Sequence, residues 1–347
     1  MIETDLNSLW FLLIAVLWIG YFFLEGFDFG VGILLPFVGR DDPDRRVALR
    51  AIGPHWDGNE VWLIVAGGAT FAAFPEWYAT LFSGFYLPLF IILMALIVRG
   101  VAFEFRAKDR HPRWRAAWDG AIFVGSLLPA FLWGVAFANI VRGVPIDAAA
   151  EYTGSLWTLL NPYALLGGLA TLLLFTLHGA TFLGLKALGP VAQRAHAAGR
   201  WLAPATVAVA AGFFAWTLIE AAGAERGDLG LLPLGALIAV AAVSAFAALS
   251  SMGLLAAGRD GWAFVATGAT IVTAVLMLFM SLYPRVMPSS TNPDYTLDIY
   301  NAASTPTTLR VMTVVALIFV PLVLAYQAWS YWVFRKRVTR EQLSPSS

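Results

Sequence analysis

The side chains of this chain that could do chemistry are ionisable groups inside apolar stretches of sequence. They are Glu25, Asp28, Asp57, Glu60, Arg99 and Asp119. Two pairs of these carboxylates are spaced three residues apart, so each pair shares one face of a helix. Inserting a charged residue into hydrocarbon costs about 2.5–3.5 kcal/mol, so such groups have a functional or structural reason to be there.

Two kinds of chemistry fit this candidate site, which we define as the six ionisable residues together with Trp56. Carboxylates outnumber Arg99, so one guanidinium cannot neutralise them all, and protonatable groups on a hydrated path can relay protons. We assign a proton role to Asp57, which stands beside Trp56 in a polar break of an apolar run. For Arg99, Asp28 and Asp119, an ion-pair lock between helices is an equal alternative.

Composition defines the broad class of the protein. Of its 347 residues, 59% are hydrophobic and only 13% are charged, whereas soluble proteins have about 25% charged residues. The chain is therefore an integral membrane protein. Its formal net charge of zero gives no nucleic-acid signature. The absence of cysteine excludes disulfides, thiolate catalysis and cysteine-ligated metals or haems.

The four histidines give little support for a metal or haem site. None has a second histidine four residues away, so neither a bis-histidine haem nor a histidine-rich copper site is indicated. His178 lies in an apolar run, where we expect a hydrogen-bonded packing residue. We therefore expect this chain to bind no haem and no metal ion itself.

The predicted fold is an all-α integral membrane protein with nine transmembrane helices, forming a single membrane domain over residues 1–347. Nine apolar stretches are long enough to cross a bilayer. They span residues 8–38, 51–74, 77–104, 116–141, 161–187, 201–223, 230–257, 261–284 and 307–334. The connections between them are too short to hold a soluble domain.

Lysine and arginine residues are distributed unevenly among the connections. If these alternate with the N-terminus outside, seventeen basic residues fall on the inner side and three on the outer side, namely Arg142, Arg226 and Arg285. The positive-inside rule therefore predicts an external N-terminus and a cytoplasmic C-terminus. This orientation places the candidate site near the cytoplasmic face.

Short connections also predict which spans are neighbours. Residues 8–141 are expected to form a first four-helix bundle, which contains the charge cluster. Residues 161–284 are expected to form a second four-helix bundle with few ionisable groups. Residues 307–334 are then a peripheral ninth helix.

Several long motifs, in order along nearly the whole chain, resemble subunit II of the cytochrome bd quinol oxidases of bacterial respiratory chains. They are FLEGFDFGVGILLP at 23–36, GPHWDGNEVWL at 53–63, FAAFPEWYA at 71–79, RGVAFEFR at 99–106, YPRVMPSS at 283–290, ASTPTTLRVM at 303–312 and PLVLAYQAWSYWVF at 321–334. Glu25 departs from the aspartate that is more usual in the family, but it keeps the charge.

The resemblance implies a complex in the bacterial inner membrane that oxidises quinol and reduces dioxygen to water without pumping protons. Haems b and d and the quinol-oxidising loop would belong to the partner, subunit I. Asp57 would lie where protons enter from the cytoplasm, and Asp28, Arg99 and Asp119 would support assembly or haem retention. Some members include a small single-span subunit or hold a structural quinone in subunit II, and membrane lipid is the alternative occupant.

A proton-coupled secondary transporter is the alternative from another functional class. Such a protein has a substrate site near the membrane midplane, formed by broken helices. Here the carboxylates lie towards the cytoplasmic side and in the first half of the chain. This placement favours an accessory subunit that conducts protons and scaffolds its partner.

Overall fold

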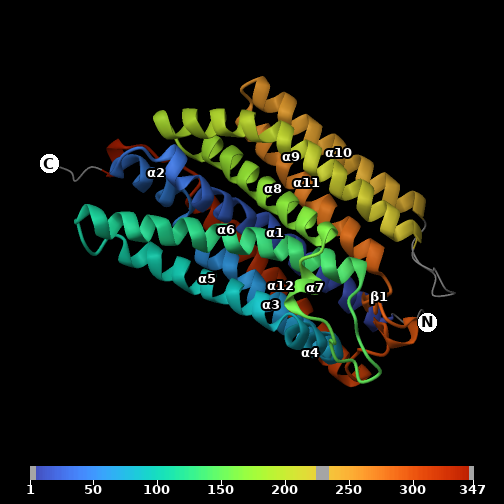
Figure 1. Ribbon diagram of the computed structural model, residues 1–347. Coiled ribbons are helices and arrows are strands. Elements are labelled where there is room, and N and C mark those ends of the chain that lie inside the picture. Colours follow the sequence, from blue (N-terminus) through green and yellow to red (C-terminus); the bar gives the residue numbers. More distant parts are fainter. Residues whose placement is uncertain (1–4, 224–233, 344–347) are drawn as a thin grey trace.

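Long helices packed along one another form most of the protein (Figure 1). The computed structural model describes residues 5–223 and 234–343. In this part of the chain, eight helices are long and apolar enough to cross a membrane. They are α1 (Leu6–Val38), α5 (Tyr86–Phe105), α6 (Pro112–Arg142), α8 (Pro162–Lys186), α9 (Pro190–Gly223), α10 (Leu234–Ala256), α11 (Asp260–Leu282) and α12 (Pro306–Val333). The all-α membrane class is confirmed.

The second and third predicted spans are each more divided than expected. An amphipathic helix, α2 (Asp42–Ile52), precedes α3 (Trp56–Ala73), whose polar first turns keep it out of the apolar set. The stretch predicted as one helix over 77–104 consists of α4 (Pro75–Gly84) and α5, which are separated at Phe85. Pro88 has no N–H to bond the Gly84 carbonyl, so a continuous helix is disfavoured there.

Several helices begin at a capping residue that is closely followed by proline. The side chains of Asp41, Asn161 and Thr305 each accept a hydrogen bond from a backbone N–H three residues later. Proline then occupies the first or second helical position. Capping oxygens satisfy the free N–H groups of a helix start, and proline fits where no N–H is needed.

α1 lies at the centre and packs against α3, α6 and α8 (Figure 1). Gly30 of α1 faces Gly179 of α8 so closely that a Cβ on Gly30 would lie 2.0 Å from a backbone oxygen. Gly134 of α6 meets Gly167 of α8 in the same way, at 2.3 Å. Small residues at these crossings let the helix backbones touch, which joins the two halves of the chain.

Two connections cover the end of the protein where α1 begins. The segment between α6 and α8, which contains α7 (Leu156–Leu159), meets the segment between α11 and α12. The second segment holds the antiparallel strands β1 (Arg285–Met287) and β2 (Leu297–Asp298), with a 3₁₀ turn, η1 (Pro293–Tyr295), between them. Backbone hydrogen bonds from Val144 to Pro288 and from Ser290 to Val144, at 3.0 and 2.9 Å, join them.

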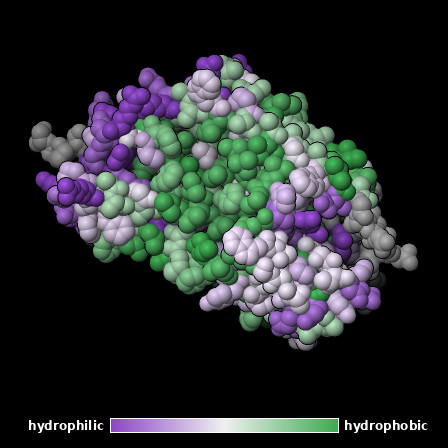
Figure 2. Space-filling view, viewed as in Figure 1, coloured by the Kyte–Doolittle hydropathy of each residue, from purple (hydrophilic) through white to green (hydrophobic). Residues whose placement is uncertain are grey.

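At the other end, the segment after α12 returns across the bundle and ends in η2 (Glu341–Leu343). The Val338 N–H donates to the Lys186 carbonyl at 2.9 Å, and the Leu188 N–H donates to the Val338 carbonyl at 3.0 Å. Between the two hydrophilic ends, Figure 2 shows a broad apolar surface, as a bilayer requires. Two parts of the sequence prediction lie outside the described residues. They are Arg226 in an outer connection and residues 230–233 of the seventh predicted span.

Candidate functional site

Arg99 is completely buried and joins three helices. Its Nη1 donates to Glu25 Oε1 of α1 and, at 2.8 Å, to Glu60 Oε1 of α3. Its guanidinium also lies 4.9 Å from the ring centre of Phe29 and 5.2 Å from that of Phe103. Two carboxylates and two aromatic faces offset the cost of removing this cation from water. An ion pair shared by α1, α3 and α5 thus forms the centre of the site.

Asp28 is also completely buried, but its partner is neutral. The Asn59 amide of α3 donates to Asp28 Oδ2 at 2.7 Å. Asn59 was not predicted as a site residue, because an amide carries no charge and does not stand out in an apolar stretch as a carboxylate does. Its position inside the WDGNE run of the second motif, between Asp57 and Glu60, was the available signal.

Asn59 also forms hydrogen bonds with α12. Its Oδ1 accepts from the Tyr331 hydroxyl at 2.8 Å and from Gln327 Nε2 at 3.4 Å. Gln327 in turn accepts from Trp62 Nε1 at 2.9 Å, and the His55 ring stacks on Tyr331 at 4.1 Å. Gln327 and Tyr331 are four residues apart and share one helix face, so this polar pair in an apolar helix was a second missed signal.

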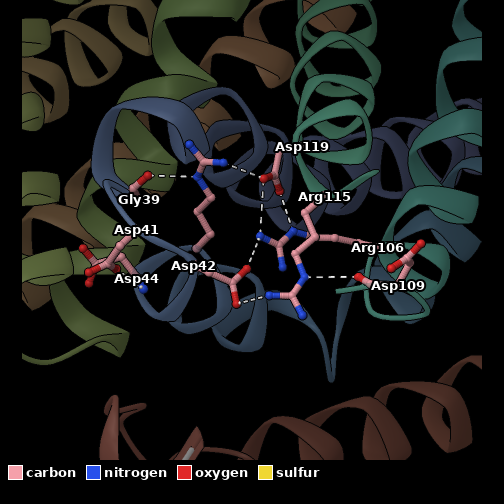
Figure 3. A network of polar contacts seen from close by, with 9 residues as sticks. Gly39, Asp41, Asp42, Asp44, Arg106, Asp109, Arg115 and Asp119 are labelled. Carbon is pink, nitrogen blue, oxygen red and sulfur yellow. Dashed lines mark hydrogen bonds and ion pairs between the residues drawn. The ribbon is translucent and has the colours of Figure 1, made fainter. Parts of the chain in front are cut away.

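Asp119 belongs to a separate network at the hydrophilic end (Figure 3). It accepts from Arg45 at 2.8 Å and from Arg106 at 2.5 Å. Arg106 also contacts Asp42 at 2.9 Å, and Arg115 contacts the same carboxylate at 2.7 Å. The network joins α2 to the α5–α6 connection. In the sequence, these arginines indicate the topology but not the partners that they have in the fold.

The ion pair of Arg99 has Glu25 and Glu60 as its partners, whereas the lock considered from the sequence paired Arg99 with Asp28 or Asp119. Gly125 of α6 lies level with Arg99, since a Cβ on Gly125 would be 2.8 Å from the Arg99 Cβ. Asp119 comes six residues earlier, about 9 Å along the helix axis, where it pairs with Arg45 and Arg106 instead. Asp28 is rotated on α1 relative to Glu25 and faces Asn59 instead.

Accessibility separates the remaining site residues. Asp57, in the first turn of α3, is exposed in this chain. Trp56 is half-buried and packs on Phe103, with the ring centres 4.9 Å apart. The Glu60 side chain is 21% exposed. The acids of α3 therefore run from the surface inwards to the buried Arg99.

The buried centre retains hydrogen-bonding capacity. Glu25 Oε2, Asp28 Oδ1, Arg99 Nε and Arg99 Nη2 are buried and have no hydrogen-bond partner among the described residues. Buried polar atoms in proteins are normally satisfied, often by ordered water. Such atoms next to one another can bind water molecules.

His178 has the surroundings expected of a packing residue. Its Nδ1 lies 2.7 Å from Thr267 Oγ1, its Nε2 lies 3.2 Å from the Phe23 carbonyl oxygen, and its ring stacks on Phe264 at 4.5 Å. Both ring nitrogens therefore have partners within the protein.

The fold and the site define a multi-pass helical membrane protein with a buried ion-pair cluster near one face. Comparison with known proteins identifies its family. The model of the family described as cytochrome bd terminal oxidase subunit II matches residues 6–334. The chain belongs to this family, as its motifs indicated. It is a subunit of an oxidoreductase complex in the bacterial inner membrane.

Individual relatives agree with this assignment. The chain is 43% identical over 340 residues to cytochrome bd ubiquinol oxidase subunit 2 of Bacillus subtilis (strain 168), covering 98% of each protein. It is 37% identical over 367 residues to cytochrome bd-I ubiquinol oxidase subunit 2 of Escherichia coli (strain K12), covering 97% of this chain and 96% of the relative.

A solved structure, that of bd oxidase from Geobacillus thermodenitrificans, shares the fold. It superposes with a TM-score of 0.78 at 18% identity, covering 96% of this chain and 100% of the other.

Proposed function

We propose that this chain is the haem-free subunit II of a quinol-oxidising, dioxygen-reducing complex. In that role it scaffolds the haem-bearing subunit I and helps conduct protons from the cytoplasm. Its relatives from Bacillus subtilis and Escherichia coli are each subunit 2 of a ubiquinol oxidase, which supports both the substrate and the partner. The observation that carries the proton role is the series of acids from exposed Asp57 through Glu60 to Glu25.

A proton relay needs one group in contact with bulk water and further groups that pass protons along hydrogen bonds. Asp57 meets the first requirement, and Glu60, one turn further along α3, meets the second through its contact with Arg99. The unpartnered oxygen atoms of Glu25 and Asp28 provide acceptors for water molecules beyond this point. Trp56 covers this side of α3 by packing on Phe103.

We also propose that α3 crosses the membrane, which gives nine spans with an external N-terminus and a cytoplasmic C-terminus. Its eighteen residues extend about 27 Å, close to the roughly 30 Å of a hydrocarbon core. The arginine-rich network around Asp119 then lies at the cytoplasmic face. In this scheme, spans one to four and five to eight form two four-helix groups, and the largely exposed α12 lies outside both.

The haems are proposed to lie in subunit I, because both ring nitrogens of His178 have partners within this chain. The apolar hollow lined by Phe22, Trp133 and Phe213 has a volume of about 40 Å³, so a structural quinone would have to widen it. The exposed apolar side chains of this chain are available as a docking site for a small single-span subunit. No observation favours the transporter alternative.

Purification through a tag on this chain tests the proposal. Co-expressed with subunit I, the tagged chain should retain a haem-bearing partner and support oxygen uptake with ubiquinol. Expressed alone, it should give a reduced-minus-oxidised spectrum without haem bands. Stoichiometric haem in the isolated chain, or a tagged chain that retains no haem protein, would refute it.

A further inference from the structure

A hollow of about 650 Å³ lies away from the candidate site, at the hydrophilic end of the second half of the chain. Three segments surround it: the last turn of α8 at Gly184, the α10–α11 turn, and the segment after α12. Arg259 enters the hollow from the turn, and Arg337 enters it from the segment after α12. Two cations that are 78 positions apart in sequence thus line one space.

The two arginines have their charge available for a ligand. Both side chains are exposed, and neither forms an ion pair or side-chain hydrogen bond with any described residue. The one carboxylate that lines the hollow, Asp260, lies 2.7 Å from His196 Nδ1 and is held by it. The hollow therefore has a net positive charge.

The backbone around the hollow is well fixed. Gly258 has a φ of +71°, a conformation that favours glycine and reverses the chain between α10 and α11. Arg337 precedes Val338, whose backbone pairs with Lys186 and Leu188. The arginine pair is thus presented by two anchored segments.

One wall of the hollow is apolar and faces outwards. Trp262 and Val265, in the first turns of α11, are 66% and 55% exposed and share one helix face. Tryptophan at the end of a membrane-spanning helix typically lies at the level of the lipid headgroups. A ligand in the hollow can therefore contact the arginines with an anionic group and the α11 surface with a hydrocarbon chain.

We propose that this hollow binds an anionic phospholipid, with its phosphate between Arg259 and Arg337 and its acyl chains against Trp262 and Val265. A freely dissolved phosphate would use the arginines but gain nothing from the apolar wall, so the lipid is favoured. In the orientation proposed above, the site lies in the cytoplasmic leaflet. The lipid site itself does not depend on the proton role of Asp57.

Binding of short-chain dioctanoyl phosphatidylglycerol to the delipidated, haem-loaded complex tests this proposal by titration calorimetry. Each of Arg259→Gln and Arg337→Gln should weaken the affinity about fivefold, the effect of one basic residue at a charged membrane surface. In the double variant, the two losses of binding free energy should add. Lys336→Gln is the matched control, since Lys336 is exposed beside Arg337 but does not line the hollow.

Two further probes identify the ligand. Dioctanoyl phosphatidylcholine should bind more weakly than phosphatidylglycerol and be less affected by either arginine variant, and inorganic phosphate should bind far more weakly than the lipid. A loss in Lys336→Gln equal to that in Arg337→Gln would show a general positive surface and overturn the site. Tight binding of inorganic phosphate would overturn the lipid assignment. Unchanged haem spectra confirm that each variant is assembled.

Discussion

Asn59 and Tyr331, which are 272 positions apart in sequence, are joined by a hydrogen bond of 2.8 Å from the tyrosine hydroxyl to Asn59 Oδ1. The same asparagine donates to buried Asp28 at 2.7 Å. Most side chains of α12 are exposed, so polar contacts have a large share in attaching this helix. At its other end, Trp10 Nε1 donates to the Leu309 carbonyl at 3.2 Å.

Substitution of either partner should therefore loosen α12. Tyr331→Phe removes one hydrogen bond and should cost about 1 kcal/mol, whereas Asn59→Leu also leaves Asp28 without its donor and should cost about 1–3 kcal/mol. Thermal unfolding of the purified complex measures both. Tyr326→Phe is the control, because Tyr326 is 68% exposed on the same helix. A lower melting temperature in the control than in Tyr331→Phe would contradict this account.

The Arg99 ion pair gives a second prediction. Arg99→Met should leave Glu25 and Glu60 unpaired and reduce assembly strongly, because an uncompensated buried charge costs about 3–5 kcal/mol. Adding Glu25→Gln should restore part of the assembled complex. Adding Asp119→Asn should not, since Asp119 pairs with Arg45 and Arg106. Haem content per purified chain measures assembly, and equal rescue by both second substitutions would refute the pairing.

The location of the ion pair followed from sequence, but its partners did not. Because a charged side chain is costly in hydrocarbon, Glu25, Glu60 and Arg99 are expected to pair with some opposite charge, whichever it is. The choice between Glu25 and Asp28 depends on the rotation of α1, because residues three apart point about 60° away from each other. Rotation is set by packing, such as the contact of Gly30 with Gly179, which a single sequence does not specify.

The break at Phe85 and the network around Asp119 were not predicted from the sequence, each for a different reason. The break at Phe85 interrupts an apolar run whose composition fits one continuous helix, and only Pro88 indicates it. The network around Asp119 depends on how α2 folds back onto the α5–α6 connection. Such contacts between distant connections are set by tertiary structure, whereas the membrane class and most of the spans follow from hydropathy.

The segment after α12 should respond to acid. Hydrogen bonding from the Asp44 backbone N–H, together with the nearby Arg340 guanidinium, holds the pKa of Asp41 below its usual range. A carboxyl whose folded pKa lies below its unfolded value of about 3.9 stabilises the fold above that pH. This contribution is lost as the pH falls through the depressed pKa. Asp41 contacts Arg340 at 3.0 Å, so this contact should then weaken.

A spin label on the exposed Lys336→Cys position can report this change, since the chain has no cysteine. In a complex with a cysteine-free partner, label mobility should be similar at pH 7 and pH 5 and should rise below about pH 4. Asp41→Asn should raise the mobility at pH 7 and flatten its pH dependence. The same pH profile in this variant as in the parent would exclude Asp41 as the responsible group.

The proton role of Asp57 gives the last prediction. Asp57→Asn removes the exposed proton carrier without touching the Arg99 ion pair, so the complex should assemble with full haem spectra. Oxygen uptake per haem with ubiquinol should fall at least about tenfold, as expected when a proton-transferring group is lost. Asp57→Glu keeps a carboxyl and should retain part of the rate. Glu104→Gln is the matched control, because Glu104 is also an exposed acid near this end of the bundle.

The outcomes separate three roles for Asp57. Slow turnover with normal haem content in Asp57→Asn, and normal turnover in Glu104→Gln, would support proton uptake through α3. Loss of haem together with rate would make Asp57 a structural residue. Unchanged turnover would remove it from the proton path, and uptake would then have to begin at Glu60, whose side chain is 21% exposed and reaches Arg99 directly.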